Sequence, residues 1–178
     1  MKTKHIKDKD FHLFITDAEI KDRIDKLGAR INVDYAGKRP LFICVLNGAF
    51  MFASDLIKKL DFFPEISFVK VSSYSGMQTT GSVKKLIGLN ESIAGRDLIL
   101  IEDIIDSGLT MKYLLHELKD KKPASIKLAT LLFKPDSFQA EYPIDYIGFE
   151  IPNEFVVGYG MDYDGYGRNL PDIYHLKS

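Results

Sequence analysis

The chain has 178 residues, a net charge of −1, a hydrophobic fraction of 46% and a charged fraction of 28%. These values are typical of one soluble globular domain, which we expect to span residues 1–178. Because basic residues are not in excess, general nucleic-acid binding has no electrostatic support. The apolar runs are too short to cross a bilayer, so we expect no membrane partner.

The only cysteine, Cys44, lies inside the apolar run 41–46. One cysteine cannot form a disulfide within a chain, and the basic residues 1–7 are not followed by the apolar core of a secretory signal. We therefore expect a cytoplasmic protein. Cys44 is interpreted as a buried strand residue, because a nucleophilic cysteine would need an exposed, electropositive setting.

Helical and extended patterns alternate along the chain. Thr16-Asp17-Ala18-Glu19 fits a capping box, and apolar residues follow it at helical spacing. The expected elements are, in order, a helix over 17–33, a strand over 41–46, a helix over 49–60, a strand over 66–73, a mobile loop or extended hairpin over 72–83, a strand over 98–101, a helix including 111–118, and strands over 126–133, 146–151 and 155–158.

This alternation predicts an α/β fold with a mostly parallel twisted sheet flanked by helices. Ligands of such sheets bind beyond the carboxyl ends of the strands. The polar segments 46–48 and 102–110 are both expected at such ends.

Residues 98–110 run from an apolar strand into a polar turn that opens a helix. Glu102, Asp103 and Asp106 fall within five residues, where their negative charges repel one another. The Ser107–Thr110 turn offers backbone N–H groups, hydroxyls and the positive end of a helix dipole, which suit a phosphate. Asp106 could simply cap the helix, but a cap leaves Glu102 and Asp103 unexplained. A ribose 5-phosphate would place its phosphate in the turn and its two secondary hydroxyls against the carboxylates.

The stretch 98–110 closely resembles the signature of the type I phosphoribosyltransferases, which bind phosphoribosyl pyrophosphate (PRPP). The resemblance implies that Glu102 and Asp103 hold the ribose hydroxyls. We expect Asp106 to act as the general base, taking or sharing the proton at N7 of a purine. The residues expected to bind the 5-phosphate are Ser107, Gly108, Leu109 and Thr110.

Other segments resemble the hypoxanthine (hypoxanthine-guanine) phosphoribosyltransferases. Asn47-Gly48 matches their pyrophosphate-binding turn, although many members carry Lys or Arg in place of Asn47. The family tends to hold the peptide bond before this position in the cis form. Ser73 and Tyr74 open the segment that becomes a mobile lid, and Arg168 is expected to contact the departing pyrophosphate.

The same resemblance assigns a purine site. Lys134 would otherwise be a solvated lysine; here it is expected to donate to the purine 6-oxo group and so to reject adenine. Phe155 is expected to stack on the purine and Val156 to contact the base edge through its backbone. The implied cofactor is Mg²⁺, held near the pyrophosphate partly through water. The candidate metal-binding residues are Asp162, Glu102 and Asp103, of which Asp162 also belongs to the purine-binding set.

The implied reaction belongs to purine salvage. It transfers 5-phosphoribosyl from PRPP to N9 of hypoxanthine, and of guanine, giving IMP or GMP and pyrophosphate. The resemblance also implies a small hood formed by the N- and C-terminal segments, and assembly as a homodimer or homotetramer. The apolar residues 50–52 could serve such an interface or could belong to the core.

Three other interpretations remain open from the residues alone. A PRPP-sensing regulator would keep the same turn but should carry a basic face, which this near-neutral chain lacks. A phosphoribosyltransferase for xanthine, adenine or orotate would differ at the base site. A nonenzymatic nucleotide-binding module would not need Asp106, Asp162 and Arg168 together.

Overall fold

The computed structural model describes residues 2–73, 83–89 and 91–177, with the backbone alone described for 72, 73 and 83–87. Its α-helices are α1 (Asp17–Asp34), α2 (Phe50–Ile57) and α3 (Leu109–Lys119), and a short 3-10 turn covers Pro135–Ser137. Its strands are β1 (Thr3–Ile6), β2 (Lys9–Ile15), β3 (Leu41–Leu46), β4 (Glu65–Ser73), β5 (Val83–Ile87), β6 (Asp97–Ile105), β7 (Ser125–Phe133), β8 (Tyr146–Glu150), β9 (Val156–Val157) and β10 (Ile173–Leu176).

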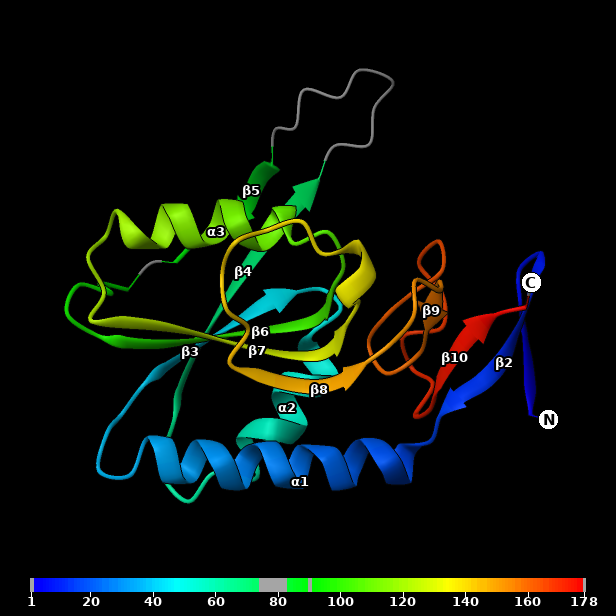
Figure 1. The fold of residues 1–178 in the computed structure, drawn as a ribbon, viewed down its shortest axis with the longest axis horizontal. Coiled ribbons are helices and arrows are strands. Elements are labelled where there is room, and N and C mark those ends of the chain that lie inside the picture. The colour runs from blue at the N-terminus through cyan, green and yellow to red at the C-terminus, as the bar shows by residue number, and fades with distance from the viewer. Residues whose placement is uncertain (1, 74–82, 90, 178) are drawn as a thin grey trace.

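The larger sheet has six strands in the order β5-β4-β3-β6-β7-β8. Every neighbouring pair from β4 to β8 is parallel, and β5 adds to the edge in the antiparallel direction. Helices α1 and α2 lie on one side of this sheet and α3 on the other (Figure 1). The predicted α/β fold class is therefore confirmed.

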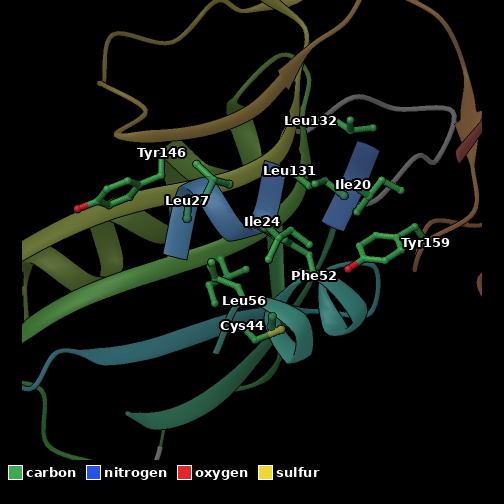
Figure 2. Close-up of a cluster of buried hydrophobic side chains, with 14 of the residues drawn as sticks. Ile20, Ile24, Leu27, Cys44, Phe52, Leu56, Leu131, Leu132, Tyr146 and Tyr159 are labelled. Atoms are coloured by element: carbon green, nitrogen blue, oxygen red, sulfur yellow. The ribbon is translucent and has the colours of Figure 1, made fainter. Parts of the chain in front are cut away.

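Burial on both faces explains the apolar runs of the central strands. In β3, Phe42 and Cys44 belong to the core cluster that includes α1 and α2, whereas Ile43 and Val45 belong to the cluster beneath α3. Figure 2 shows Cys44 among apolar side chains from the first cluster. Cys44 is fully buried, and this burial raises the pKa of its thiol to about 12. The interpretation of Cys44 as a structural residue is confirmed.

The first predicted helix is confirmed almost to the residue. Thr16 caps it: its side chain accepts from the Glu19 backbone N–H, and the Glu19 carboxylate accepts from the Thr16 N–H at 2.8 Å. The second helix is shorter than predicted, because after Ile57 the chain continues in 3-10-type turns such as that from the Lys59 N–H to the Leu56 carbonyl. Among the described residues, no helix has the length and apolar character needed to span a membrane.

Strand β6 is longer than the predicted 98–101. It runs to Ile105, and its last residues stay paired with β7, with Ile105 opposite Phe133. Glu102 and Asp103 therefore lie within the strand and not in the turn. The prediction ended the strand too early because two adjacent carboxylates are unfavourable in an average strand. Pairing with β7 outweighs that preference here.

The second sheet forms the expected hood from both ends of the chain. It is antiparallel, in the order β1-β2-β10-β9, and lies beside the carboxyl ends of the larger sheet (Figure 1). The predicted strand 155–158 contributes only Val156–Val157. The buried Asp172 carboxylate ties the hood to α1, because it accepts from Lys2 Nζ at 2.7 Å and from the Asp17 N–H at 2.9 Å.

Candidate active site

A cavity of about 260 Å³ opens between the carboxyl ends of β6 and β7 and the segment that includes β9. Ligand sites of parallel sheets are expected at this edge. Its lining residues are Asp103, Ile104, Asp106, Lys134, Phe155, Val156, Met161 and Asp162. The cavity therefore brings together residues from three predicted segments. It adds Ile104 and Met161, which sequence reasoning missed because an apolar side chain carries no chemical signal that distinguishes a site from a core.

Lys134 and Asp106 form an ion pair at the centre of the lining. Lys134 follows the last residue of β7, and its backbone N–H donates to the carbonyl of Ile105 at 3.0 Å, which fixes it beside the end of β6. Its Nζ lies 2.9 Å from Oδ2 of Asp106. The Lys134 side chain is only 9% exposed and that of Asp106 is 50% exposed, so the pair is buried at the ammonium and open at the carboxylate.

The alternative in which Asp106 caps the following helix is excluded. The N-cap of α3 is Gly108, without a capping side chain, and the Asp106 carboxylate points to Lys134. Gly108 has a left-handed backbone (φ 80°), which lets the chain turn from strand to helix within a few residues. A second cavity, of about 110 Å³, is lined by this turn, including Ser107, Leu109 and Thr110, and by Glu102.

Glu102 and Asp103 differ in their surroundings. Glu102 is buried, and burial together with the neighbouring Asp103 carboxylate raises the pKa of Glu102 well above its usual range. Its Oε1 accepts from the Asp103 N–H at 3.1 Å, while Asp103 Oδ1 accepts from the Ile104 N–H at 2.8 Å. Backbone N–H donors thus hold the Asp103 carboxyl group at the first cavity and the Glu102 carboxyl group at the second.

The Asn47-Gly48 turn follows β3 and packs directly on Asp103. The Leu46–Asn47 peptide bond is cis, the form that the hypoxanthine phosphoribosyltransferases tend to hold before this position. A Cβ at Gly48 would overlap the Asp103 carboxylate, and a Cβ at Gly160 would overlap the Gly48 carbonyl. Only glycine allows these two backbones and the carboxylate to approach so closely.

Phe155 is 47% exposed and forms an open apolar wall of the cavity. Its ring is held at an angle to that of Tyr163, with centroids 5.9 Å apart, and lies 6.3 Å from the ring of Phe11. Val156 is buried in β9, where it pairs with His175. About half of the Phe155 side chain therefore remains exposed at the cavity.

Asp162 and Arg168 are paired with each other. Asp162 Oδ1 lies 2.6 Å from Nη2 of Arg168, and Arg168 Nη1 donates to the Gly160 carbonyl at 2.7 Å. Asp162 Oδ2 also accepts from the Gly165 N–H, which closes the loop. Asp162 lines the cavity of about 260 Å³, whereas Arg168 pairs with Asp162 without being one of the lining residues. Among the two predicted lid residues, Ser73 ends β4, whereas Tyr74 lies outside the described residues.

Within the described ranges, no three histidine, cysteine or acidic side chains gather closely enough to hold a metal ion by themselves. Mg²⁺ commonly keeps several waters and binds through one or two carboxylates together with substrate phosphates. Asp103 and Asp162, which line the same cavity, fit that kind of binding.

Comparisons with known proteins agree with this geometry. Residues 15–164 match the phosphoribosyl transferase domain family. The chain is 46% identical over 166 residues to the hypoxanthine-guanine phosphoribosyltransferase of Bacillus subtilis, covering 93% of this chain and 92% of that protein. A crystal structure of a hypoxanthine phosphoribosyltransferase from Staphylococcus aureus has a TM-score of 0.89 at 41% identity, covering 93% of this chain and 91% of that one.

The chain also matches the bifunctional protein TilS/HprT of Listeria monocytogenes, with 47% identity over 166 residues, and spans 26% of that protein's length. The fold, the strand-end cavity and these similarities show that the chain belongs to the phosphoribosyltransferase family. The family resemblance seen in the sequence is thereby confirmed.

Proposed function

We propose that this chain transfers the 5-phosphoribosyl group from PRPP to N9 of hypoxanthine and guanine, releasing pyrophosphate and IMP or GMP. The observation that carries the proposal is one cavity lined by Asp106, Lys134 and Phe155, adjoining a second cavity lined by the turn 107–110. The two cavities therefore offer adjoining binding sites for a flat base, a ribose and a phosphate. The similarity to hypoxanthine-guanine phosphoribosyltransferases supports the same substrates.

Base recognition is assigned to the buried ammonium of Lys134 and to the partly exposed ring of Phe155. A lysine ammonium has three donors and no acceptor. One donor of Lys134 bonds Asp106, and another can reach a purine 6-oxo oxygen while the base stacks on Phe155. A 6-amino group would meet a donor instead of an acceptor, so adenine should bind poorly. The backbone of Val156 is assigned to the base edge.

The proposed chemistry forms a bond between N9 and the anomeric carbon of PRPP while the bond from that carbon to pyrophosphate breaks. The purine loses its N7 proton during the attack. Asp106 is assigned to accept this proton, since its carboxylate is half exposed at the cavity. Glu102 and Asp103 are assigned to the ribose hydroxyls, and residues 107–110 to the 5-phosphate.

The leaving pyrophosphate is assigned to the Asn47-Gly48 turn and to Arg168, whose guanidinium would move from Asp162 to the anion. We assign Mg²⁺ to Asp162, Glu102 and Asp103. When bound, the ion would neutralise charge on the pyrophosphate. Ser73 and Tyr74 are proposed to belong to a lid that excludes water.

We also propose that residues 1–178 act as one domain in the cytoplasm and that two or four copies assemble. Phe50, at the start of α2, is 43% exposed, and this apolar exposure supports an interface there. Phe52 belongs to the core.

The proposal is tested by incubating the protein with PRPP, Mg²⁺ and, separately, hypoxanthine, guanine, xanthine, adenine and orotate. Nucleotide formation is measured by chromatography. The proposal expects IMP and GMP, with little or no AMP or orotidylate. AMP as the main product, or the absence of any nucleotide, would refute it.

A further inference from the structure

The turn that opens α3 has few restraints of its own. Its N-cap, Gly108, provides no side-chain bond, and the Ser107 hydroxyl accepts from the Leu109 N–H only at a long 3.5 Å. Such a turn binds an anion well only if its N–H groups already point the same way. Something outside the turn must therefore fix its orientation.

The residues that restrain the turn come from the segment 138–142, which follows β7. The Tyr142 hydroxyl donates to the Gly108 carbonyl at 2.8 Å, and the Gln139 N–H donates to the Ser107 carbonyl at 3.2 Å. The Gly108 carbonyl also accepts from the Lys112 N–H at 2.9 Å, inside α3. Both lone pairs of this carbonyl are thus used, one by the helix and one by Tyr142.

The contact is so close that any side chain at position 108 would force Phe138 or Tyr142 to shift. A Cβ there would lie 2.6 Å from Phe138 Cε2 and 2.8 Å from the Tyr142 oxygen. The missing side chain of Gly108 therefore serves two purposes, since it permits the left-handed backbone and leaves room for the Tyr142 hydroxyl to reach the carbonyl.

Tyr142 is itself held in place. Its ring packs edge-on against Phe138 with centroids 5.3 Å apart, and Phe138 packs edge-on against Phe133 at the end of β7. These three rings join the core cluster beneath α3. Burial, and secondarily the charge of Glu102, raises the pKa of the Tyr142 hydroxyl, which therefore remains a donor at neutral pH.

We propose that Tyr142 is a positioning residue that fixes the turn 107–110 for the 5-phosphate of PRPP. The inference rests on the proposed function of that turn. The segment 134–142 then begins at the base site with Lys134 and ends at the phosphate site with Tyr142, so one connection after β7 sets the spacing of the two substrate groups.

The test compares Tyr142→Phe with Tyr113→Phe in the full chain. Each change removes one hydroxyl and keeps the ring. Tyr113 lies on α3, and its hydroxyl donates to Glu117 and not to the turn. The measurements are KM for PRPP, KM for hypoxanthine, kcat, the Kd of ribose 5-phosphate by calorimetry, and the melting temperature. For Tyr142→Phe we expect KM for PRPP and the Kd of ribose 5-phosphate to rise about fivefold, the effect of one lost hydrogen bond, with KM for hypoxanthine unchanged.

Tyr113→Phe should leave all of these binding constants unchanged. The inference is overturned if Tyr142→Phe leaves ribose 5-phosphate binding unaltered, or if it weakens hypoxanthine and PRPP equally with a lower melting temperature, which would mark a general structural role. The Kd of ribose 5-phosphate does not depend on turnover. It therefore separates failure of this inference from failure of the proposed function. A wild-type protein that binds ribose 5-phosphate, with a Kd that Tyr142→Phe raises, but forms no nucleotide would refute the reaction and leave the positioning role intact.

Discussion

Lys134 and Asp106 meet across the ends of two neighbouring strands, with Nζ and Oδ2 2.9 Å apart. The two side chains assigned to the 6-oxo group and to N7 of the purine are therefore already paired before a base binds. These two purine atoms are neighbours on one edge of the base, so a single ion pair can address both. The pairing also compensates the positive charge of the buried Lys134 ammonium, which would destabilise the fold if it had no partner.

Replacing Asp106 with Ala is expected to lower kcat by about 10²–10⁴-fold, the range for loss of a general base. Because the phosphate turn and ribose acids remain, the Kd of PRPP should change little. Steady-state kinetics and PRPP titration check this. Asp136→Ala, at an exposed position in the nearby 3-10 turn, is the matched control and should retain wild-type turnover. Unchanged turnover in Asp106→Ala would rule out the assignment of the base.

Lys134→Gln should weaken the preference for hypoxanthine over adenine. A glutamine amide both donates and accepts, so it can meet a 6-amino group that an ammonium rejects. We expect the ratio of kcat/KM for the two bases to fall at least about tenfold. Lys127→Gln serves as the control, because Lys127 lies on β7, the strand that Lys134 follows, and pairs with Asp145 at the surface. An unaltered ratio in Lys134→Gln would remove Lys134 from base recognition.

Gly48→Ala is expected to disable the site, because its Cβ would overlap the Asp103 carboxylate and force the turn or the carboxylate to move. A displacement of about 1 Å at a reacting centre can cost on the order of 10²-fold in rate. Gly95→Ala provides the contrast, because Gly95 has a left-handed backbone (φ 69°) in open space. That change should lower stability and spare kcat/KM. Wild-type kinetics in Gly48→Ala would show that the close approach is not needed.

Stability should depend on pH through Asp172. Hydrogen bonding from Lys2, and then from the Asp17 N–H, lowers the pKa of this buried carboxyl below its usual value. Ionised Asp172 therefore stabilises the fold above its ordinary pKa, and the contribution is lost as pH falls through the lower folded-state pKa. Asp172→Asn should cost about 1–3 kcal/mol in the free energy of unfolding at pH 7, with a smaller difference in acid.

Urea unfolding at pH 7 and at acid pH measures this difference. Asp22→Asn is the control, since Asp22 pairs with Lys26 on the exposed side of α1 and should change stability by less than about 1 kcal/mol. An Asp172→Asn difference that is the same at both pH values would contradict the account.

Local patterns were sufficient to predict the five parallel strands of the larger sheet, though not the antiparallel edge strand β5, and the neighbourhood of the site. The capping box at Thr16 and the two-sided apolar runs such as 41–46 act through short-range physics, and both are confirmed. The sequence also indicated that the acids at 102–106 and Lys134 belong near strand ends. Parallel pairing of β6 with β7 then brings Lys134 and Asp106 together.

Features set by contacts distant in sequence were not predicted. The extension of β6 through Glu102 and Asp103 depends on its pairing with β7, and the packing of Gly48 on Asp103 joins residues from different strands. The contact of Tyr142 with Gly108 spans 34 positions and carries no local pattern. Likewise, the partner of Arg168 could not be predicted from the sequence, because an arginine in a half-buried ion pair and a solvated arginine give the same sequence pattern.

A crystal structure of the protein with IMP bound tests the central claim most directly. The account predicts the 5-phosphate within hydrogen-bonding distance of the turn 107–110, the ribose hydroxyls against Glu102 and Asp103, and the purine between Lys134 and Phe155 with its 6-oxo group toward Nζ. IMP bound outside this cavity, or with its phosphate away from the turn, would contradict it.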